Sequence, residues 1–370
     1  MPFVDFPFPV CYNARRYANT FLKRKEMGHV KLLTVVVPCY NSAAYMHKAI
    51  DSLLVGGEEM DILVINDGSK DETGAIADDY AAKHPSIVRV VHKENGGHGS
   101  GLNKGIELGL GIYFKVVDSD DRLDKDGLLG LLDILRKHTA PEDQLDLIVH
   151  DYVYDREEKQ AVFGMSYHTV MPRDKAMTWH DVKHFPLQKQ FMIHSLVYRI
   201  QMLRDMGLVL PEKVFYEDNI YIFRPLPYTK RIYYYHAPVY GYFIGRADQS
   251  VNDNVIIKRL DQVSFIAEEM ICSYTLAELE SLPRHLCNYM INNLAGQLAT
   301  TSALQFIDGT EERGLAMNRH MWQRIRDFDI RLYKRLRRNP LGMMTVLPGK
   351  IGRKLLVWGY RTGRKLIKFG

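Results

Sequence analysis

The chain has 370 residues, 46% of them hydrophobic, which is enough to bury a full core as one large domain with additions or as two domains. A formal net charge of +5 gives no nucleic-acid footprint, and four cysteines in no metal-ligand spacing are typical of a reduced, intracellular protein. No apolar window has the length of a membrane span, and three prolines near the N-terminus argue against a signal-peptide core.

The predicted elements alternate between strands and helices. Residues 1–30 read as an aromatic, proline-rich and then basic arm. Apolar runs predict strands at 32–37, 61–66, 87–92, 112–117 and 145–150, and helical spacing predicts helices at 42–54, from an N-cap at Asp71 through Tyr80, at 100–110 and at 125–138. Two further short strands are expected around Ala237–Pro238, followed by a helical pattern from 255 to about 338. Such alternation is typical of β-α-β units around a mostly parallel sheet.

Polar, turn-forming residues follow four of the predicted strands. They occupy positions 38–41, 66–69, 95–97 and 118–121. Parallel α/β sheets bind ligands at the carboxyl ends of their strands. Four such loops on one edge therefore favour a ligand site over unrelated turns.

The stretch 116–121, VVDSDD, places three carboxylates within four positions after a buried strand. Crowded carboxylates repel one another unless a cation or a shared proton relieves them. One interpretation is a polar turn with a helix N-cap after it. The other is a divalent metal site, which carboxylate oxygens suit. The three other loops favour the metal site, and Asp121 is left as either a helper of that site or the cap of the next helix.

The motifs TVVVPCYN, VINDGSKDET, KENGGHGSGLNKG, VVDSDD and YED occur in this order between Lys31 and Val251. With these motifs in this order, the chain resembles bacterial family 2 glycosyltransferases with the GT-A fold. The resemblance implies an α/β fold, a mostly parallel Rossmann-like sheet flanked by helices, with a helical C-terminal extension. It divides the chain into an arm at 1–30, a catalytic domain at 31–251, a helical region at 252–340 and a basic amphipathic tail at 341–370.

The resemblance also implies a donor site for a nucleoside-diphosphate sugar, with UDP as the expected nucleotide. Asp118 and Asp120 would bind Mn²⁺ or Mg²⁺. The donor-binding residues would be Pro38, Tyr40, Asn41, Asp67, Asn95, Gly97, Asn103, Lys104, Asp118, Ser119 and Arg246. Many family members carry Ala-Arg-Asn where this chain has Gly101-Leu102-Asn103. The missing arginine leaves one phosphate or ribose contact without its usual residue, and Lys104 is the substitute expected to supply the charge.

For the base, the resemblance assigns Asp218 of the Glu217-Asp218 pair, with Glu217 contacting acceptor or metal. An apolar setting would raise the carboxyl pKa into a useful range for accepting the acceptor's proton. His98 is expected either to face the donor or, more simply, to lie on the surface. His194 and Tyr198 are expected to pack a helix rather than line the acceptor side.

The basic tail has an amphipathic pattern. One helical face carries large apolar residues, namely Ile351, Leu355, Trp358, Leu366 and Phe369. Residues 345–370 also contain seven basic residues and no acidic one, and the basic residues mostly occupy the other face. This favours a helix that lies on an anionic membrane surface, folding on binding, over a solvated or docked tail.

The sequence therefore predicts a metal-dependent, inverting glycosyltransferase that acts on a hydroxyl of a glycan or lipid-linked acceptor. Its place would be the synthesis of cell-envelope polysaccharide or glycolipid, in the cytoplasm at the inner face of the membrane, with no nucleic-acid partner. A homo-oligomer is left open. One alternative is a sugar nucleotidyltransferase, but such an enzyme needs a glycine-rich and basic loop for a triphosphate, and PCYNSAAY is not such a loop. The other is a non-catalytic membrane scaffold that retains a nucleotide-sugar site.

Overall fold

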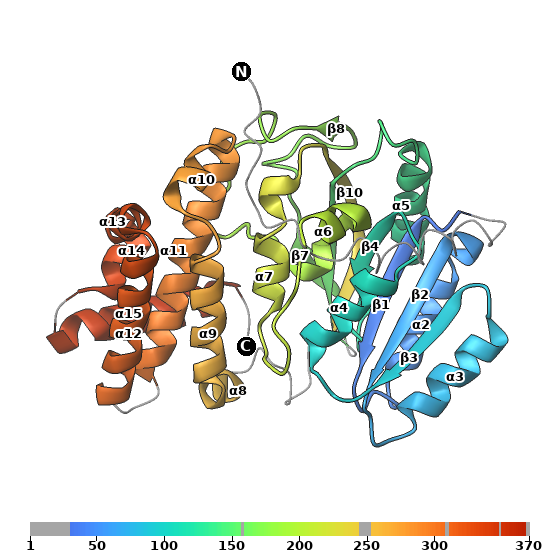
Figure 1. The fold of residues 1–370 in the computed structure, drawn as a ribbon, viewed down its shortest axis with the longest axis horizontal. Helices are drawn as coiled ribbons and strands as arrows, with labels where there is room; N and C mark the ends of the chain where they lie inside the picture. The colour runs from blue at the N-terminus through green and yellow to red at the C-terminus, as the bar shows by residue number, and fades with distance from the viewer. Residues whose placement is uncertain (1–29, 157–158, 244–252, 308–310, 348, 368–370) are drawn as a thin grey trace.

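The computed structural model describes residues 30–367 apart from 157–158, 244–252, 308–310 and 348. Residues 1–29 of the predicted arm, Arg246, and Phe369 of the tail stripe lie outside the described residues. The described chain forms an α/β part, with a bundle of helices from the later sequence packed beside it (Figure 1).

One mixed sheet organises the α/β part. Its described strands are β1 (Leu33–Cys39), β2 (Met60–Asp67), β3 (Val88–Lys93), β4 (Tyr113–Val116), β5 (Arg122–Leu123), β6 (Leu147–Arg156), β7 (Lys159–Met165), β8 (Ala176–Met177), β9 (Leu196–Arg199) and β10 (Ile232–Phe243). Their order is β3-β2-β1-β4-β9-β6-β10-β5, with β7 beside β6 and β8 beside β10. β3, β2, β1 and β4 are parallel, as are β6 and β10, while β9 runs antiparallel to both its neighbours.

Helices cover both faces of the sheet. The α/β part contains α2 (Met46–Leu54), α3 (Thr73–Lys83), α4 (His98–Leu108), α5 (Lys125–Lys137), α6 (Ile200–Asp205) and α7 (Asp218–Phe223), with the short 3₁₀ turns η1 (Gly57–Glu59), η2 (Ile193–Ser195) and η3 (Leu226–Tyr228). Side chains alternate along a strand. Val36 of β1 accordingly packs in a core with α4, whereas Val35 and Val37 pack in a second core with α2 and α5.

The later sequence is helical, as predicted. It comprises α8 (Asp253–Lys258), α9 (Leu260–Ile271), α10 (Leu276–Glu280), α11 (Arg284–Ile307), α12 (Glu311–Phe328), α13 (Ile330–Arg338), α14 (Pro340–Thr345) and α15 (Gly349–Ile367). α9 packs on α7, and the core on the α4 side of the sheet continues into α9 and α11.

Four local features of the fold correct the predictions or decide between alternatives that the sequence left open. The two short strands expected around Ala237–Pro238 are one strand, β10, whose register with β6 shifts on both sides of Pro238 because of a bulge. Helix α3 begins at Thr73, and Asp71 lies before its N-cap position, accepting hydrogen bonds from the Thr73 backbone and hydroxyl. The cap of α5 is Asp124, so of the two roles left open for Asp121 the structure does not support the capping one.

The fourth concerns the segment of His194 and Tyr198, which was expected to be a helix. His194 lies in η2 and Tyr198 in β9, because this segment enters the sheet between β4 and β6. Tyr198 is buried and donates its hydroxyl proton to the carbonyl of Ile222, so it packs the core as expected.

One buried carboxylate ties the parallel strands together. Asp61 of β2 accepts hydrogen bonds from the Thr34 hydroxyl of β1 (2.7 Å), from Nε and Nη2 of Arg89 in β3 (2.7 and 2.9 Å), and from the Leu110 amide before β4 (2.8 Å). Its removal would leave a guanidinium and two buried donors without their acceptor.

We therefore expect Asp61→Ala to lower the free energy of unfolding by about 3–5 kcal/mol, the cost of breaking a buried ion pair. Urea unfolding followed by circular dichroism measures this change. The matched control is Asp79→Ala, which removes an exposed pair with Lys83 and should cost about 0.5 kcal/mol or less. Equal midpoints for the two variants would show that Asp61 does not hold the sheet.

Candidate active site

The carboxylates of Asp118 and Asp121 follow the end of β4. The Tyr240 hydroxyl of β10 donates to Asp121 Oδ2 (2.5 Å), and the Phe243 amide donates to Oδ1 (2.7 Å). The same tyrosine oxygen accepts the amide proton of Asp118 (3.2 Å). Burial, reinforced by the charges of Asp118 and Asp120, raises the pKa of Asp121 well above its usual range. The Asp121 carboxyl therefore favours its protonated form unless a cation is close.

His98 bridges this pair to the Glu217-Asp218 motif. It is the first residue of α4, after Gly97, whose φ of 82° is a conformation that glycine adopts without strain. Its Nδ1 lies 2.6 Å from Glu217 Oε1 and its Nε2 lies 3.2 Å from Asp118 Oδ1. Burial alone would lower the pKa of His98, but these hydrogen bonds hold it well above its usual value. They also keep the pKa of Asp118 below its usual value against the opposing effect of burial.

The Glu217-Asp218 pair lies at the start of α7. Glu217 is buried, and Asp218 is half-buried at the first helical position. Burial, followed by the charge of Glu217, raises the pKa of Asp218 to about 7. A carboxyl with that pKa can accept a proton near neutral pH and still be basic enough to drive the transfer.

His194 reaches the same place from η2. Its buried ring stacks on Tyr242, with ring centroids 4.6 Å apart. Neither ring nitrogen has a hydrogen-bond partner among the described residues. Burial lowers the pKa of His194 to about 4, so the ring is neutral with a lone pair available. Buried polar atoms without partners are rare and costly, which points to a ligand for this ring.

Asp118, Asp121 and His194 form a group that fits a metal ion. Each offers one ligand atom, and these atoms lie within 4.8 Å of one another. Two carboxylate oxygens and a neutral imidazole can together hold a divalent metal ion. Within the described residues this group contains Asp121 and His194 rather than the Asp120 expected from the sequence.

Asp67 organises the donor loop predicted at 95–97. Its carboxylate accepts hydrogen bonds from Lys93 Nζ (2.6 Å) and from the amides of Gly96 (2.9 Å) and Gly97 (2.8 Å). The Asn95 side chain donates to the backbone carbonyl of Asp67 (3.0 Å). The structure thus brings the predicted residues Asp67, Asn95 and Gly97 together after β2 and β3.

The predicted residues after β1 also lie at this edge. Tyr40 is exposed, and Asn41 accepts the Lys70 amide proton (2.8 Å), which ties the loop after β1 to the loop after β2. Pro38 is half-buried. Ser119 contacts the Ser42 hydroxyl (2.9 Å).

Asn103 and Lys104 are engaged elsewhere. The Asn103 amide makes two hydrogen bonds of 2.9 Å with the backbone of Leu210, and Lys104 pairs with Glu107 on α4. Leu102, at the position of the family's arginine, is buried in the core. Of the residues in this loop and helix, His98 is the one that contacts Asp118.

The sequence analysis did not assign the site contacts of three residues: His98, which was expected either to face the donor or to lie on the surface, His194, which was expected to pack a helix, and Tyr240. His98 contacts Asp118, 20 residues away, and Glu217, 119 residues away, and Tyr240 contacts Asp121, 119 residues away, so the long-range contacts have no local signal. The missing arginine at Leu102 did indicate that another residue must supply a charge to the phosphates or ribose, but the expected substitute, Lys104, pairs with Glu107.

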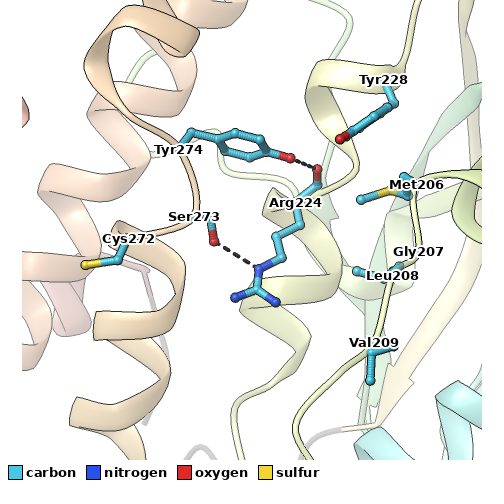
Figure 2. A pocket seen from close by; sticks show the side chains of 9 residues that line it. All are labelled: Met206, Gly207, Leu208, Val209, Arg224, Tyr228, Cys272, Ser273 and Tyr274. Carbon is cyan, nitrogen blue, oxygen red and sulfur yellow. Dashed lines mark hydrogen bonds between the residues drawn. The ribbon is translucent and has the colours of Figure 1, made fainter. Parts of the chain in front are cut away.

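A cavity of about 330 Å³ lies at the other end of α7 (Figure 2). Arg224, directly after α7, donates from Nε to the Ser273 hydroxyl there (2.9 Å), and Tyr274 donates to the Arg224 carbonyl (2.6 Å). None of its lining residues belongs to the carboxylate site.

Comparison with known proteins identifies the family and the fold. The model of "Glycosyl transferase family 2" matches residues 34–185. The chain is 31% identical over 229 residues to the uncharacterized glycosyltransferase MG025 of Mycoplasma genitalium, covering 59% of this chain and 70% of that protein. It is 34% identical over 181 residues to the uncharacterized glycosyltransferase RP339 of Rickettsia prowazekii, covering 48% of this chain and 52% of that protein.

Among solved structures, S. aureus TarS 1–349 is similar with a TM-score of 0.63 at 17% identity, over 90% of this chain and 92% of that one. A second TarS structure, in complex with UDP-GlcNAc, gives a TM-score of 0.51 at 18% identity, over 80% of this chain and 90% of that one. The predicted GT-A fold is thereby confirmed. The chain belongs to glycosyltransferase family 2.

The bridge made by His98 gives a prediction for stability. His98→Leu leaves the buried Glu217 and the half-buried Asp118 without their shared donor, so we expect a loss of about 1–3 kcal/mol in the free energy of unfolding. Chemical unfolding measures it. His320→Leu is the control, because that histidine is exposed and its partner Glu268 keeps Arg324. A His98→Leu protein as stable as the control variant would contradict the bridging role.

Proposed function

We propose that this glycosyltransferase is a metal-dependent, inverting enzyme that transfers a hexose or N-acetylhexosamine from a UDP-linked donor to a hydroxyl of a glycan or lipid-linked acceptor. The synthesis of cell-envelope polysaccharide or glycolipid, at the inner face of the cell membrane, is the setting that we propose. The observation that carries the proposal is the unpartnered, neutral His194 beside Asp118 and Asp121, close to a second carboxyl pair with a raised pKa at Asp218.

Asp118, Asp121 and His194 are the residues that would hold Mn²⁺ or Mg²⁺. The ring nitrogens of His194 lack any other partner among the described residues, and the raised pKa of Asp121 reports a carboxyl that a nearby cation would ionise. Asp120, the second acid of the D-x-D pattern, remains a proposed ligand. When bound, such a cation neutralises the charge that develops on a nucleoside-diphosphate leaving group.

Asp218 is the proposed base. Inverting transfer is a displacement at the anomeric carbon: the acceptor oxygen forms the new bond, the bond to the diphosphate breaks, and the acceptor proton passes to a carboxylate. Glu217 is held by His98 and contributes negative charge that keeps Asp218 basic. We propose this positioning role for Glu217 in place of a direct contact with acceptor or metal.

The donor would lie across the loops after β1, β2 and β3. We propose that the exposed Tyr40 contacts the face of the uracil, that Asp67 shapes the loop containing Asn95 and Gly97, and that Arg246 reaches the phosphates. TarS, which shares the fold, has been crystallised with UDP-GlcNAc, which supports a UDP-linked donor. The side chain of Asn103 is hydrogen-bonded to the backbone of Leu210, so we propose that it holds α4 against the segment around Leu210 and does not contact the donor.

The experiment that tests this function is a panel of nucleotide sugars with Mn²⁺, scored for release of nucleoside diphosphate and for thermal stabilisation. We expect both for one UDP-sugar. Release of pyrophosphate from a nucleoside triphosphate and a sugar phosphate would show instead that the chain is a nucleotidyltransferase.

For the base, we predict that Asp218→Asn binds UDP normally but turns over about two to four orders of magnitude more slowly. In the wild type the base must be unprotonated, so kcat/KM should fall as pH drops through about 7. Glu217→Gln removes a nearby negative charge, so its acid limb should move to lower pH. If Asp218→Asn is active and Glu217→Gln is inactive at every pH, the roles are reversed.

For the metal, we predict that His194→Phe, which keeps a ring against Tyr242, weakens Mn²⁺ binding at least about tenfold. Calorimetric titration of Mn²⁺ in the presence of UDP measures the affinity. His168→Phe serves as the control, since that exposed histidine lies outside the group. Full affinity in His194→Phe combined with loss of binding in Asp120→Ala would restore the Asp118-Asp120 pair as the site.

A further inference from the structure

Helix α15 docks on the protein through one side and presents an apolar stripe on the other. Leu356 is only 3% exposed and Gly352 is buried, where α15 packs on α11 and α14. Ile351 is 77% exposed, Leu355 49% and Trp358 67%. Their spacing of four and three residues places these three side chains on one helical face. The helix is therefore folded and anchored while its largest apolar side chains face outward.

The segment before α15 exposes two more apolar side chains. Leu347 is exposed and lies against Gly352, at the start of α15, and Met343 of α14 is exposed as well. Isolated exposed apolar residues are ordinary, but three large ones on one helical face mark an interaction site. We call Ile351, Leu355 and Trp358 the α15 ridge.

Basic side chains flank the ridge. At 3.6 residues per turn, Lys350, Lys354 and Arg361 fall along one border of the stripe, and all three are exposed. The sequence of α15 contains no acidic residue. Nearby in sequence, α13 exposes five more cations: Arg331, Lys334, Arg335, Arg337 and Arg338.

We propose that the α15 ridge is the surface by which this protein binds an anionic lipid membrane. Large apolar side chains, among them an exposed tryptophan, beside a border of cations match the acyl and headgroup layers of an anionic leaflet. Within the described residues no helix combines the length and apolar content needed to cross a bilayer, so the contact is one of a helix lying on the surface. A second copy of the chain is disfavoured as occupant, because a symmetric contact would set these cations against one another.

The inference rests on this surface alone and not on the proposed transfer chemistry. It corrects the expectation that the segment folds only on binding, because α15 already packs against α11. The residues that it names for the contact do not include two from the predicted stripe. Phe369 lies outside the described residues, and so does the side chain of Leu366.

The test is co-sedimentation of the full chain with vesicles of phosphatidylcholine alone or with about one third phosphatidylglycerol, at low and high salt. We expect binding to the anionic vesicles only, weakened by salt. Ile351→Ser/Leu355→Ser/Trp358→Ser should abolish it. Lys350→Gln/Lys354→Gln/Arg361→Gln should weaken it by about a hundredfold, at about fivefold for each cation.

The matched control is Val55→Ser/Leu129→Ser/Leu187→Ser, three apolar residues exposed on the α/β part, which should bind as the wild type does. Because every mutated side chain is exposed, circular dichroism should show unchanged folding. The proposal is overturned if the wild type does not sediment with anionic vesicles, or if the ridge variant binds as well as the control. It is also overturned if light scattering shows a dimer that only the ridge variant loses, without vesicle binding, since the ridge would then be a self-association surface. None of these three results would bear on donor turnover, which is measured separately.

Discussion

The candidate site depends on the way one imidazole balances carboxylates that the fold brings together. Asp118 and Asp121 arrive from the end of β4, and Glu217 and Asp218 from the start of α7. An ionised carboxylate can accept hydrogen bonds but cannot donate one. His98 donates to one member of each pair, so Asp118 and Glu217 share a cation, while Asp121 and Asp218 have raised pKa values. Carboxyl groups that differ in proton affinity within one site are a common basis of acid-base chemistry.

The antiparallel strand β9 explains the presence of His194. β4 ends at the site, and a parallel neighbour would bring its own carboxyl end there. Because β9 runs the other way, its beginning lies beside the end of β4, and η2 with His194 directly precedes it. The buried Lys115 of β4 fixes this junction by donating to the His194 carbonyl (2.7 Å). A single reversed strand thus adds a candidate nitrogen ligand to an edge otherwise formed by loops after parallel strands.

The parts of the fold that the sequence predicted are those governed by local pattern. The runs at 32–37, 61–66 and 112–117 match β1, β2 and β4 to within a few residues, because buried parallel strands are continuously apolar. The site edge followed from the loops after them. The features that the sequence did not predict depend on long-range pairing. They are the continuous strand β10, the insertion of β9 and the contacts of His98 and His194. Three acids in DSDD are also chemically alike, and only the turn after β4, with Tyr240 across from it, distinguishes Asp121 from Asp120.

The helical region participates in this arrangement. The segment leading to Glu217 bonds through the Lys213 amide to the Gly96 carbonyl (2.6 Å), and through the Phe215 amide to Gln262 of α9 (3.0 Å). Within it Lys213 and Tyr216 adopt positive φ angles of 58° and 73°, a strained conformation that persists only where the surroundings enforce it. The proposed donor loop, the proposed base and α9 are thus held by one short segment. The division at residue 251 stays a prediction from sequence, but a core that continues across it means that α9 supports the segment that leads to Glu217 and Asp218.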